Sequence, residues 1–548
     1  MKKFFGVLVL CSVFALCGWS VSVEVNQSGA NGAFTTIQAA IDSGADVITI
    51  TDSATYVENI EIGDPDEGGT PVTLTSDKDG DARPVITPSE AKAYLEVHRG
   101  DMDRGAGFGL FANNSVISNL IIEGNPDMDI TENGLGALFV MADNAVIDNC
   151  LFRPTAGTER QVKYPNTLLF FAQEGSGEQA VAGGRDCDGC IIRNSELSGV
   201  ATDADVEPTL DSQGYLLGDV NGQAATLSRM DHFTNGEDVT ITFENCNFHH
   251  SYDAGLFPSN RGSGAGSITL DFSYCRFDAM GKFAARGRGA NINADHCVFT
   301  RTNQLNNDNG ENSAIAIQTQ NGHSCTSNVT HCIFVNAGSS FAQRGFYGGV
   351  NNHNAGQMTV DHCTFIKCLS GVSIGTGGGT DETKLTVTNS IFDLIGYNSP
   401  PAIDEMGLPL EGSEFLDENG LYPAWETGLY TNFKGSSIWC AAFNNATSDV
   451  AVLSIDNCLV GEIASEDSRV WEDVFVEGTD NKDNVLGARL YCGFEDLVLG
   501  LDSVVRETPV FLNTDPDSDT PYQLDPSSPG QGLGAIFAST TVAGWEVF

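Results

Sequence analysis

The sequence predicts an all-β fold, a single-stranded right-handed parallel β-helix in which the chain winds through stacked coils. The first observation is a short repeated phrase, in which apolar and polar residues alternate up to a turn residue that Cys and Phe then follow. Its clearest copies are Ile241–Phe248, Leu270–Phe277, Ile292–Phe299, Ser327–Phe334, Met358–Phe365 and Leu385–Phe392. This pattern is typical of two short strands joined by a tight bend.

The second observation is the spacing of the copies. The Cys or Ser of the phrase recurs after 22 to 35 residues, at Cys246, Cys275, Cys297, Cys332, Cys363 and Ser390. A fixed phrase with elastic spacers predicts one structural unit per repeat with loops of varying length. Since one such unit cannot bury its own apolar face, neighbouring units must stack. The spacers lack helical periodicity, which favours a β-helix.

The N-terminus has the features of a secretory signal peptide over residues 1–22. Lys2 and Lys3 make the start basic, residues 6–18 are apolar, and Ser20-Val21-Ser22 offers a small-x-small cleavage site. The apolar run is shorter than a membrane span requires. We therefore expect a secreted protein, extracellular or at the cell surface, with no membrane insertion after cleavage.

The remaining chain divides into a body and two caps. Residues 23–500 are predicted to form the β-helix, with a capping helix at 35–44, a Pro-rich surface insertion near 397–434 and a C-terminal capping segment at 501–548. Thr35 and Gln38 fit a capping box, and Gly44 would end the helix. Strands are expected at 46–51 and 58–62.

The charge balance is strongly acidic. There are 27 basic and 73 acidic residues, and the formal net charge is −46. Such a chain is not expected to bind nucleic acid or an anionic membrane surface. Calcium is the one cofactor that the sequence suggests: Asp77, Asp79 and Asp81 alternate in a loop where Gly80 allows a sharp turn. The alternative is a solvated acidic turn.

Two columns of residues follow from stacking the phrases. The aligned Cys residues are predicted to form an internal stack, because stacked coils lie too far apart for disulfide bonds. Cys187 and Cys190 are the best local pair for a disulfide or half of a metal site. His296, His331 and His362 precede the aligned Cys. They form either a metal-binding column or a ladder of left-handed turn residues like the Asn of other copies, and the turn chemistry favours the ladder.

On these phrases and the helical opening, the chain resembles the secreted right-handed β-helix repeat proteins of the pectate-lyase-like superfamily, which share the pectin lyase fold. The resemblance implies a carbohydrate-active or adhesive protein, since that fold hosts lyases, hydrolases, esterases and non-enzymatic adhesins. Residues 137–150 resemble part of a pectin methylesterase, but the catalytic segments of esterases and polygalacturonases are missing. The Gly-x-Ser-x-Gly match at Gly371–Gly375 lies over an expected strand and not at a strand-to-helix turn, so it does not indicate a nucleophile elbow.

A cluster of scarce basic residues suggests lyase-like chemistry. Lys282, Arg286, Arg288 and Arg301 lie within twenty residues, and residues 283–293 resemble the Arg-containing coil of alginate-lyase-like β-helices. A lyase must neutralise a uronate carboxylate and remove a neighbouring carbon-bound proton, and Arg, Lys and Ca²⁺ serve these two tasks. The alternative is that these residues offset nearby acids.

Aligning the third strand of each coil predicts a binding groove. Leu256, Phe283, Ile315, Phe341 and Val372 are aligned as inward residues. Two outward columns then follow. The first is Phe257, Ala284, Ala316, Ala342 and Ser373, and the second is Ser259, Arg286, Gln318, Arg344 and, depending on register, Thr376 or Gly375. Arg286 and Arg344 would stand two coils apart, roughly 9.6 Å, where each could grip a carboxylate.

The functional hypothesis is an extracellular protein that binds an acidic polysaccharide. If it is an enzyme, it cleaves that polysaccharide by a lyase-like or a glycoside hydrolase-like reaction. Its candidate catalytic residues are Lys282, Arg286 and Arg344. Its candidate substrate-binding residues are Arg288, Gln318, Phe346 and Tyr347, of which the last two follow Arg344 and could stack on a sugar ring. The alternative is a non-catalytic surface, adhesion or structural β-helix protein.

Overall fold

The computed structural model describes most of the chain outside its longer connections. The described residues are 20–65, 67–89, 93–97, 102–124, 135–154, 167–172, 187–201, 226–232, 237–251, 254–260, 266–302, 313–320, 322–335, 337, 350–353, 356–368, 370–376, 383–394, 436–442, 451–461, 484–485, 488–489, 505–516, 518 and 521–535. The expected signal sequence up to residue 19 and the expected insertion at 397–434 lie outside them.

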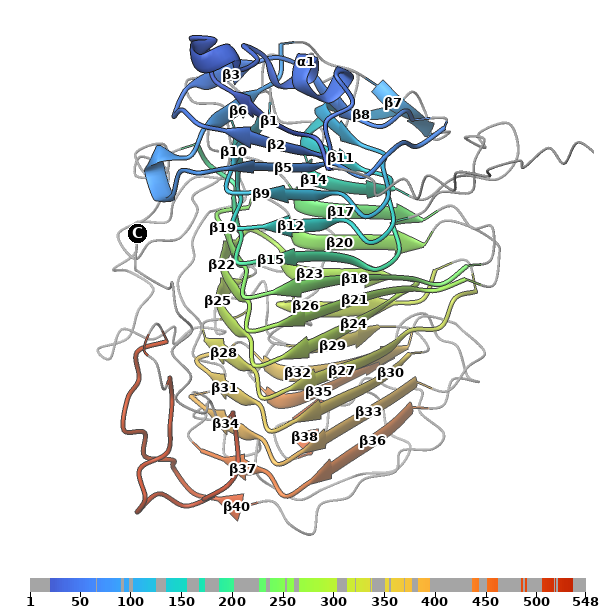
Figure 1. Cartoon of the computed structure of the whole chain (residues 1–548). Coiled ribbons are helices and arrows are strands. Elements are labelled where there is room, and N and C mark those ends of the chain that lie inside the picture. The colour runs from blue at the N-terminus through green and yellow to red at the C-terminus, as the bar shows by residue number, and fades with distance from the viewer. Residues whose placement is uncertain are drawn as a thin grey trace, which may run out of the picture.

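The protein is a right-handed parallel β-helix, as the sequence predicts (Figure 1). Three long sheets run along the stack, and every pairing between successive coils is parallel. The first sheet consists of β1 (Ser22–Val25), β2 (Val47–Ile50), β5 (Thr73–Ser76), β9 (Val116–Ser118), β12 (Val146–Asp148), β15 (Cys190–Arg193), β18 (Val239–Glu244), β21 (Ile268–Ser273), β24 (Ala290–Asp295), β27 (Thr326–Thr330), β30 (Gln357–Asp361), β33 (Thr383–Thr388) and β36 (Ala451–Asp456).

The second sheet follows the first around the coil, after a two-residue bend from β9 onward and after longer connections in the first two coils. It consists of β3 (Thr55–Val57), β6 (Val85–Thr87), β10 (Ile121–Gly124), β13 (Leu151–Pro154), β16 (Glu196–Ser198), β19 (Asn247–His249), β22 (Arg276–Met280), β25 (Val298–Thr302), β28 (Ile333–Val335), β31 (Thr364–Ile366), β34 (Ile391–Asp393), β37 (Leu459–Val460) and β40 (Val505–Arg506).

The third sheet closes the coil. It consists of β4 (Ile60–Ile62), β8 (Met102–Leu110), β11 (Leu135–Val140), β14 (Thr167–Ala172), β17 (Thr226–His232), β20 (Ala254–Asn260), β23 (Phe283–Arg288), β26 (Ile315–Gln318), β29 (Val350–His353), β32 (Ser370–Thr376) and β35 (Ser436–Ala442). β7 (Ala93–Val97) pairs antiparallel with β8, and β38 (Asn484–Val485) pairs antiparallel with β39 (Ala488–Arg489).

The N-terminal cap contains a short helix, α1 (Ile37–Asp42), and the 3-10 turn η1 (Ala30–Gly32); a second 3-10 turn, η2 (Gly80–Ala82), lies in the connection between β5 and β6. The capping residue is Thr36 rather than Thr35, and its side chain accepts a hydrogen bond from the amide of Ala39. Glu58 from the next coil accepts the amides of Ile37 and Gln38 at 2.9 and 3.0 Å. A carboxylate there satisfies donors that the first helical turn leaves free.

The core contains two stacks that the repeated phrase builds. Phe248, Phe277, Phe299, Phe334, Phe365 and Phe392 are the Phe column, whose neighbouring ring centroids lie 4.6 to 5.0 Å apart. The aligned Cys residues are buried and form no disulfide bonds, which confirms the predicted internal stack. Cys187 and Cys190 are also free thiols, so the local disulfide considered for them is not formed.

A left-handed turn residue joins the first sheet to the second in coil after coil. We call these residues the turn column, and their φ angles are all between 49° and 59°. Its members are Asn119, Asn149, Asn194, Asn245, Tyr274, His296, His331, His362, Asn389 and Asn457. Because Asn and His tolerate this backbone region better than most side chains do, the ladder favoured by the sequence is confirmed.

The C-terminal segment runs back along the outside of the second sheet. Tyr522 and Ala535 pack against Ile333 and Val335, and Leu533 packs against Leu459. The amide of Gly534 also donates to the carbonyl of Asn389 at 2.7 Å. This segment therefore covers the apolar outer side of several late coils.

In the part of the chain that the structure describes, no helix has the length and apolar character to cross a membrane.

Candidate functional site

Three arginines surround one phenylalanine on the outward face of the third sheet. The ring of Phe257 on β20 has the guanidinium carbons of Arg229 at 5.3 Å, Arg288 at 5.3 Å and Arg286 at 5.9 Å from its centroid. Arg286 also lies 4.8 Å from the ring of Phe283. These are cation–π contacts, in which the face of an aromatic ring attracts a positive charge. We call these five residues the Arg–Phe cluster.

Strand register explains how the cluster assembles. Arg229 on β17 is paired with Phe257, and the pairing of Leu256 with Ala285 places Phe257 beside Arg286. Arg229 and Arg286 thus stand on the same outward column, two coils apart, roughly 9.6 Å by coil stacking. The sequence predicted this spacing between Arg286 and Arg344, and the structure provides it with Arg229.

Gln318 joins the cluster from β26. Its side-chain oxygen accepts a hydrogen bond from Nη2 of Arg286 at 3.0 Å, and its backbone position is paired with Arg288. Phe283 is buried, and Arg229 is only 6% exposed, whereas Arg286, Arg288 and Gln318 are half-buried. Phe257 is half-buried as well, so a ligand can reach its ring and these last three side chains but not Arg229 or Phe283.

The register of β23 corrects part of the predicted alignment. Phe283 is not inward: it pairs with Ala254 and packs outside, against Ala254, Ala316 and Phe257. Ala285 takes the inward place beside Leu256 instead. The alignment of Phe283 with Leu256 and Ile315 predicted an inward side chain, but an outward apolar patch buries it equally well. The shift moves Arg286 into the column of Phe257 and places Arg288, not Arg286, beside Ser259.

The predicted partner strand of the following coil is also corrected. The third-sheet strand there is β29, Val350–His353, which pairs with β26 and β32, and not residues 340–345. Arg344, Phe346 and Tyr347, predicted as a catalytic residue and a stacking pair, lie outside the described residues. Their roles stay predictions.

The remaining basic residues separate in the structure. Lys282 lies half-buried in the turn between β22 and β23, directly before the cluster. Arg301 belongs to the second sheet, where its guanidinium bonds both carboxylate oxygens of Asp278. Burial raises the pKa of Asp278, but the bonds and charge of Arg301, with the charge of Arg276, outweigh it and hold that pKa well below its usual value. Arg301 therefore offsets a local acid.

A second polar group lies on the second sheet near this ion pair. Nε2 of His249 is 3.0 Å from a carboxylate oxygen of Glu196, and its Nδ1 is 2.8 Å from Nδ1 of His250. Burial, followed by the charge of His249, lowers the pKa of His250 to about 3. His250 is therefore neutral at physiological pH, which leaves this group as an internally paired network.

The acidic loop expected to bind calcium is exposed. Asp77 pairs with Lys78 at 3.0 Å, and Asp79, Gly80 and Asp81 form the exposed edge of η2. The calcium site at Asp77, Asp79 and Asp81 stays a prediction, for which loss of thermal stability in excess chelator is the measurement.

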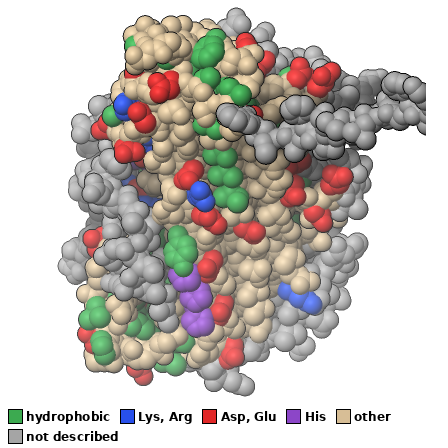
Figure 2. All heavy atoms as spheres, in the orientation of Figure 1, with side chains coloured by type: hydrophobic (Ala, Val, Ile, Leu, Met, Phe, Trp, Pro, Cys, Tyr) green, Lys and Arg blue, Asp and Glu red, His purple; other side chains and the backbone are tan. Residues whose placement is uncertain are grey.

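The histidines of the turn column form a continuous stack at the edge of the first sheet. The ring centroids are 5.1 Å apart from Tyr274 to His296, 4.5 Å from His296 to His331 and 5.2 Å from His331 to His362. Figure 2 shows this stack as a purple column with acidic side chains beside it. In the described residues, Asp295, His296 and His331 are the group of three possible metal ligands whose ligand atoms converge within 4.8 Å.

Two contributors escaped the sequence analysis. Arg229 lies on a strand outside the repeated phrase, and only the Leu227-Ser-Arg-Met230 alternation could have marked it as outward. Asp295 was overlooked although Asp-His-Cys occurs twice, at 295–297 and 361–363. That repeated triplet was the available signal for a carboxylate beside the histidine stack.

Comparisons with known proteins find likeness to β-helix structures at low identity. No protein-family model and no curated protein sequence matches this chain. The catalytic domain of a GH87 alpha-1,3-glucanase in complex with tetrasaccharides is 10% identical, with a TM-score of 0.49 over 88% of this chain and 69% of that chain. A PL6 family polysaccharide lyase from Pseudopedobacter saltans is 11% identical, with a TM-score of 0.36 over 95% and 100%.

A pectate lyase is 12% identical, with a TM-score of 0.32 over 68% of this chain and 74% of that chain. Likeness at this level concerns the winding of the chain, so function is inferred from the residues of this chain.

Proposed function

We propose that this protein is an extracellular carbohydrate-active β-helix protein that binds an acidic polysaccharide at the Arg–Phe cluster. The observation that carries the proposal is the placement of Arg229, Arg286 and Arg288 on one outward face, in a chain with only 27 basic residues and a net charge of −46. A local positive surface on such a chain selects anionic over neutral sugars.

The cluster offers directed donors as well as charge. A guanidinium can bind a carboxylate through two parallel hydrogen bonds, and Arg286 is already oriented by Gln318 and by the ring of Phe283. Arg229 packs under Phe257 and is almost fully buried, so it holds the ring while Arg286 and Arg288 contact the ligand. Pre-ordered side chains lose less entropy on binding.

The arginines of the cluster could also perform the first task of a lyase, which is to neutralise the carboxylate of the uronate. Arginines that neutralise a uronate carboxylate make the neighbouring carbon-bound proton easier to remove, and Lys282, next to the cluster, is the proposed base. Cleavage by Lys282, Arg286 and Arg344 belongs to this proposal. The alternative remains a non-catalytic surface, adhesion or structural protein that holds the polysaccharide without cleaving it.

Binding is measured with a panel of uronic-acid polymers and neutral glucans, using the full-length mature protein. Arg286→Ala and Arg288→Ala are each expected to weaken binding to the uronic-acid polymer at least about tenfold, because a hydrogen-bonded charge is lost. Arg193→Ala is the matched control, since Arg193 is an exposed arginine on the first sheet that pairs with Asp148 at 2.8 Å. Equal binding by the parent and both cluster variants would refute the proposed surface.

Catalysis is measured on the same polymers by the absorbance of unsaturated products and by reducing ends. Products that disappear with Lys282→Ala support the lyase, whereas tight binding without products supports the adhesion alternative.

Secretion is tested separately, by the N-terminal sequence of the exported protein, which is expected to begin just after residue 22.

A further inference from the structure

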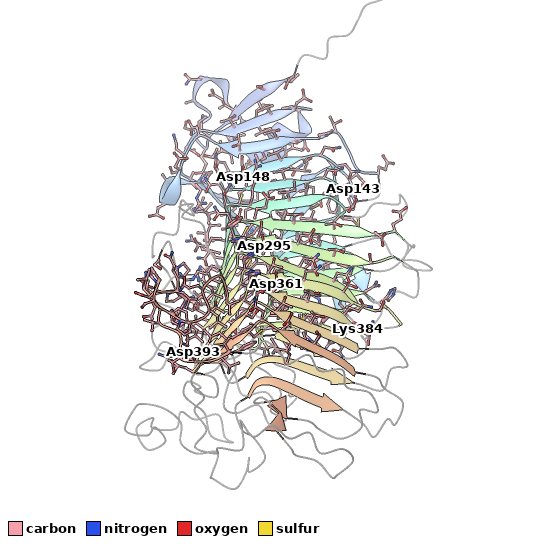
Figure 3. The ribbon with its side chains drawn as sticks, turned by 90° about the horizontal axis from the view of Figure 1, so that it is seen from below. Asp143, Asp148, Asp295, Asp361, Lys384 and Asp393 are labelled. Carbon is pink, nitrogen blue, oxygen red and sulfur yellow. The ribbon has the colours of Figure 1, made fainter. Side chains whose placement is uncertain are left out.

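The turn column contains two similar acidic units that differ at one residue. In the first, Asp295 accepts hydrogen bonds from Nδ1 of His296 at 2.9 Å and from Nδ1 of His331 at 3.3 Å. In the second, Asp361 accepts hydrogen bonds from Nδ1 of His362 at 2.8 Å and from the side-chain amide Nδ2 of Asn389 at 2.7 Å. Figure 3 shows Asp295 and Asp361 close together along the same edge.

Because the first unit has His331 where the second has Asn389, we propose that Asp295, His296 and His331 bind a divalent metal ion such as Zn²⁺. The ligand set is one carboxylate and two imidazoles, which suits Zn²⁺, Cu²⁺ or Ni²⁺ better than Ca²⁺, a cation that prefers oxygen ligands alone. The second unit offers one imidazole and an amide, and therefore lacks this ligand set.

The ligand atoms already have suitable separations. Zinc–ligand bonds of about 2.0–2.1 Å in a tetrahedral site place neighbouring ligand atoms about 3.3 Å apart. The two Nδ1 atoms lie 2.9 and 3.3 Å from the Asp295 oxygens, and all three ligand atoms are within 4.8 Å of one another. Because each Nδ1 lone pair lies in its ring plane and the two rings are stacked 4.5 Å apart with 14° between their planes, the rings must rotate out of the stack to coordinate one ion, and the backbone can stay as it is.

The surroundings hold the ligands in place and leave the site open. The hydroxyl of Thr330 donates to Oδ1 of Asp295 at 2.7 Å, and the amide of His296 donates to the carbonyl of Thr330 at 3.0 Å. Such supporting bonds orient metal ligands. The side chains of Asp295, His296 and His331 are 47%, 19% and 33% exposed, so an ion from solvent can reach them.

Binding requires a change of tautomer at both histidines. Each Nδ1 must present its lone pair to the ion, so the ring hydrogen moves to Nε2. The ion then replaces two hydrogen bonds to Asp295 with coordination bonds. Three protein ligands leave a fourth position of the tetrahedron for water.

The test titrates Zn²⁺ into the chelator-treated full-length mature protein by calorimetry. The parent is expected to bind one equivalent at this site. His331→Asn converts the first unit into a copy of the second, and should weaken zinc binding at least about tenfold. Asn fills the turn column in other coils, so far-ultraviolet dichroism and the melting temperature of the zinc-free variant should match the parent. His323→Asn, a histidine outside the column, is the control and should bind like the parent.

The reverse variant provides an independent outcome. Asn389→His places a second imidazole beside Asp361 and His362, and should add a second equivalent of zinc. Equal zinc affinity of the parent and His331→Asn overturns the proposal, as does the lack of any zinc binding by the parent. Polysaccharide binding is not part of this test, so the two proposals stand or fall separately.

Discussion

The Phe column and the turn column pass through the same coils, one inside the β-helix and one on its surface. Inside, neighbouring Phe rings from Phe248 to Phe392 are almost parallel, with interplanar angles of 3° to 6°. At the surface, the side chain changes from Asn to Tyr to His and back to Asn, although the φ angle remains within ten degrees.

The difference shows which constraint acts at each place. A buried ring must match the rings above and below it, because interiors are packed closely and a void loses contacts. A surface turn residue must only tolerate a positive φ angle and bond its neighbours. Asn does so with amide ladders, such as Asn149 to Asn119 at 2.8 Å, and His does so by stacking and by bonding Asp. Chemistry can therefore vary in the turn column without loss of the fold.

The largest expected effect breaks the interior column. Phe299→Ala removes a ring that stacks on Phe277 at 5.0 Å and on Phe334 at 4.6 Å, and should lower the free energy of unfolding by about 3–5 kcal/mol. Urea denaturation measures it. Phe299→Leu keeps most of the volume and should cost less. A loss below about 1 kcal/mol for the Ala variant would show that the Phe column is not closely packed around Phe299.

The fold could be predicted because its constraints are local and repeated. Alternation of apolar and polar residues assigns each strand, and a turn residue that tolerates positive φ assigns each bend. The aligned Cys residues, from Cys246 to Cys363, were placed inside for the same reason. Repetition of one phrase also forces its copies to stack, so the parallel pairing followed.

The site could be predicted only in part, because it depends on register and on contacts distant in sequence. The alignment of the coils suggested that Phe283 points inward beside Leu256, while the strand pairing places Ala285 there. Arg229 reaches Phe257 from a strand without the phrase. Likewise His331 meets Asp295 from 36 residues away. Sequence alternation gives a face but not the partner on the next coil.

A middle-sized effect tests the turn column. Asn149→Val and His362→Val should each lower the free energy of unfolding by about 2 kcal/mol, because a β-branched residue is strained at φ near 50° and the side-chain bond is lost. His362→Asn is the control and should change it by less than about 1 kcal/mol. Thermal or urea denaturation gives both values. Equal losses for His362→Val and His362→Asn would mean that backbone tolerance is not the shared constraint.

The smallest expected effect concerns the carboxylate that supports the histidine stack. Burial raises the pKa of Asp361, but hydrogen bonds from Thr388, His362 and Asn389 outweigh burial and lower it below its usual value. A lowered folded-state pKa stabilises the fold above the unfolded-state value near 3.9, and this contribution is lost as the pH falls through the folded-state pKa.

Asp361→Asn should therefore cost about 1 kcal/mol at pH 5, a modest value since the group is partly exposed, and markedly less at pH 3. Urea denaturation of both proteins at the two pH values measures the difference. Glu507→Gln, which removes an exposed carboxylate outside the turn column, controls for the change in net charge. If the loss from Asp361→Asn is as large at pH 3 as at pH 5, the charged form of Asp361 does not stabilise the turn column. In that case ring contacts alone order the histidine stack, and an Asn would serve as well as the aspartate beside it.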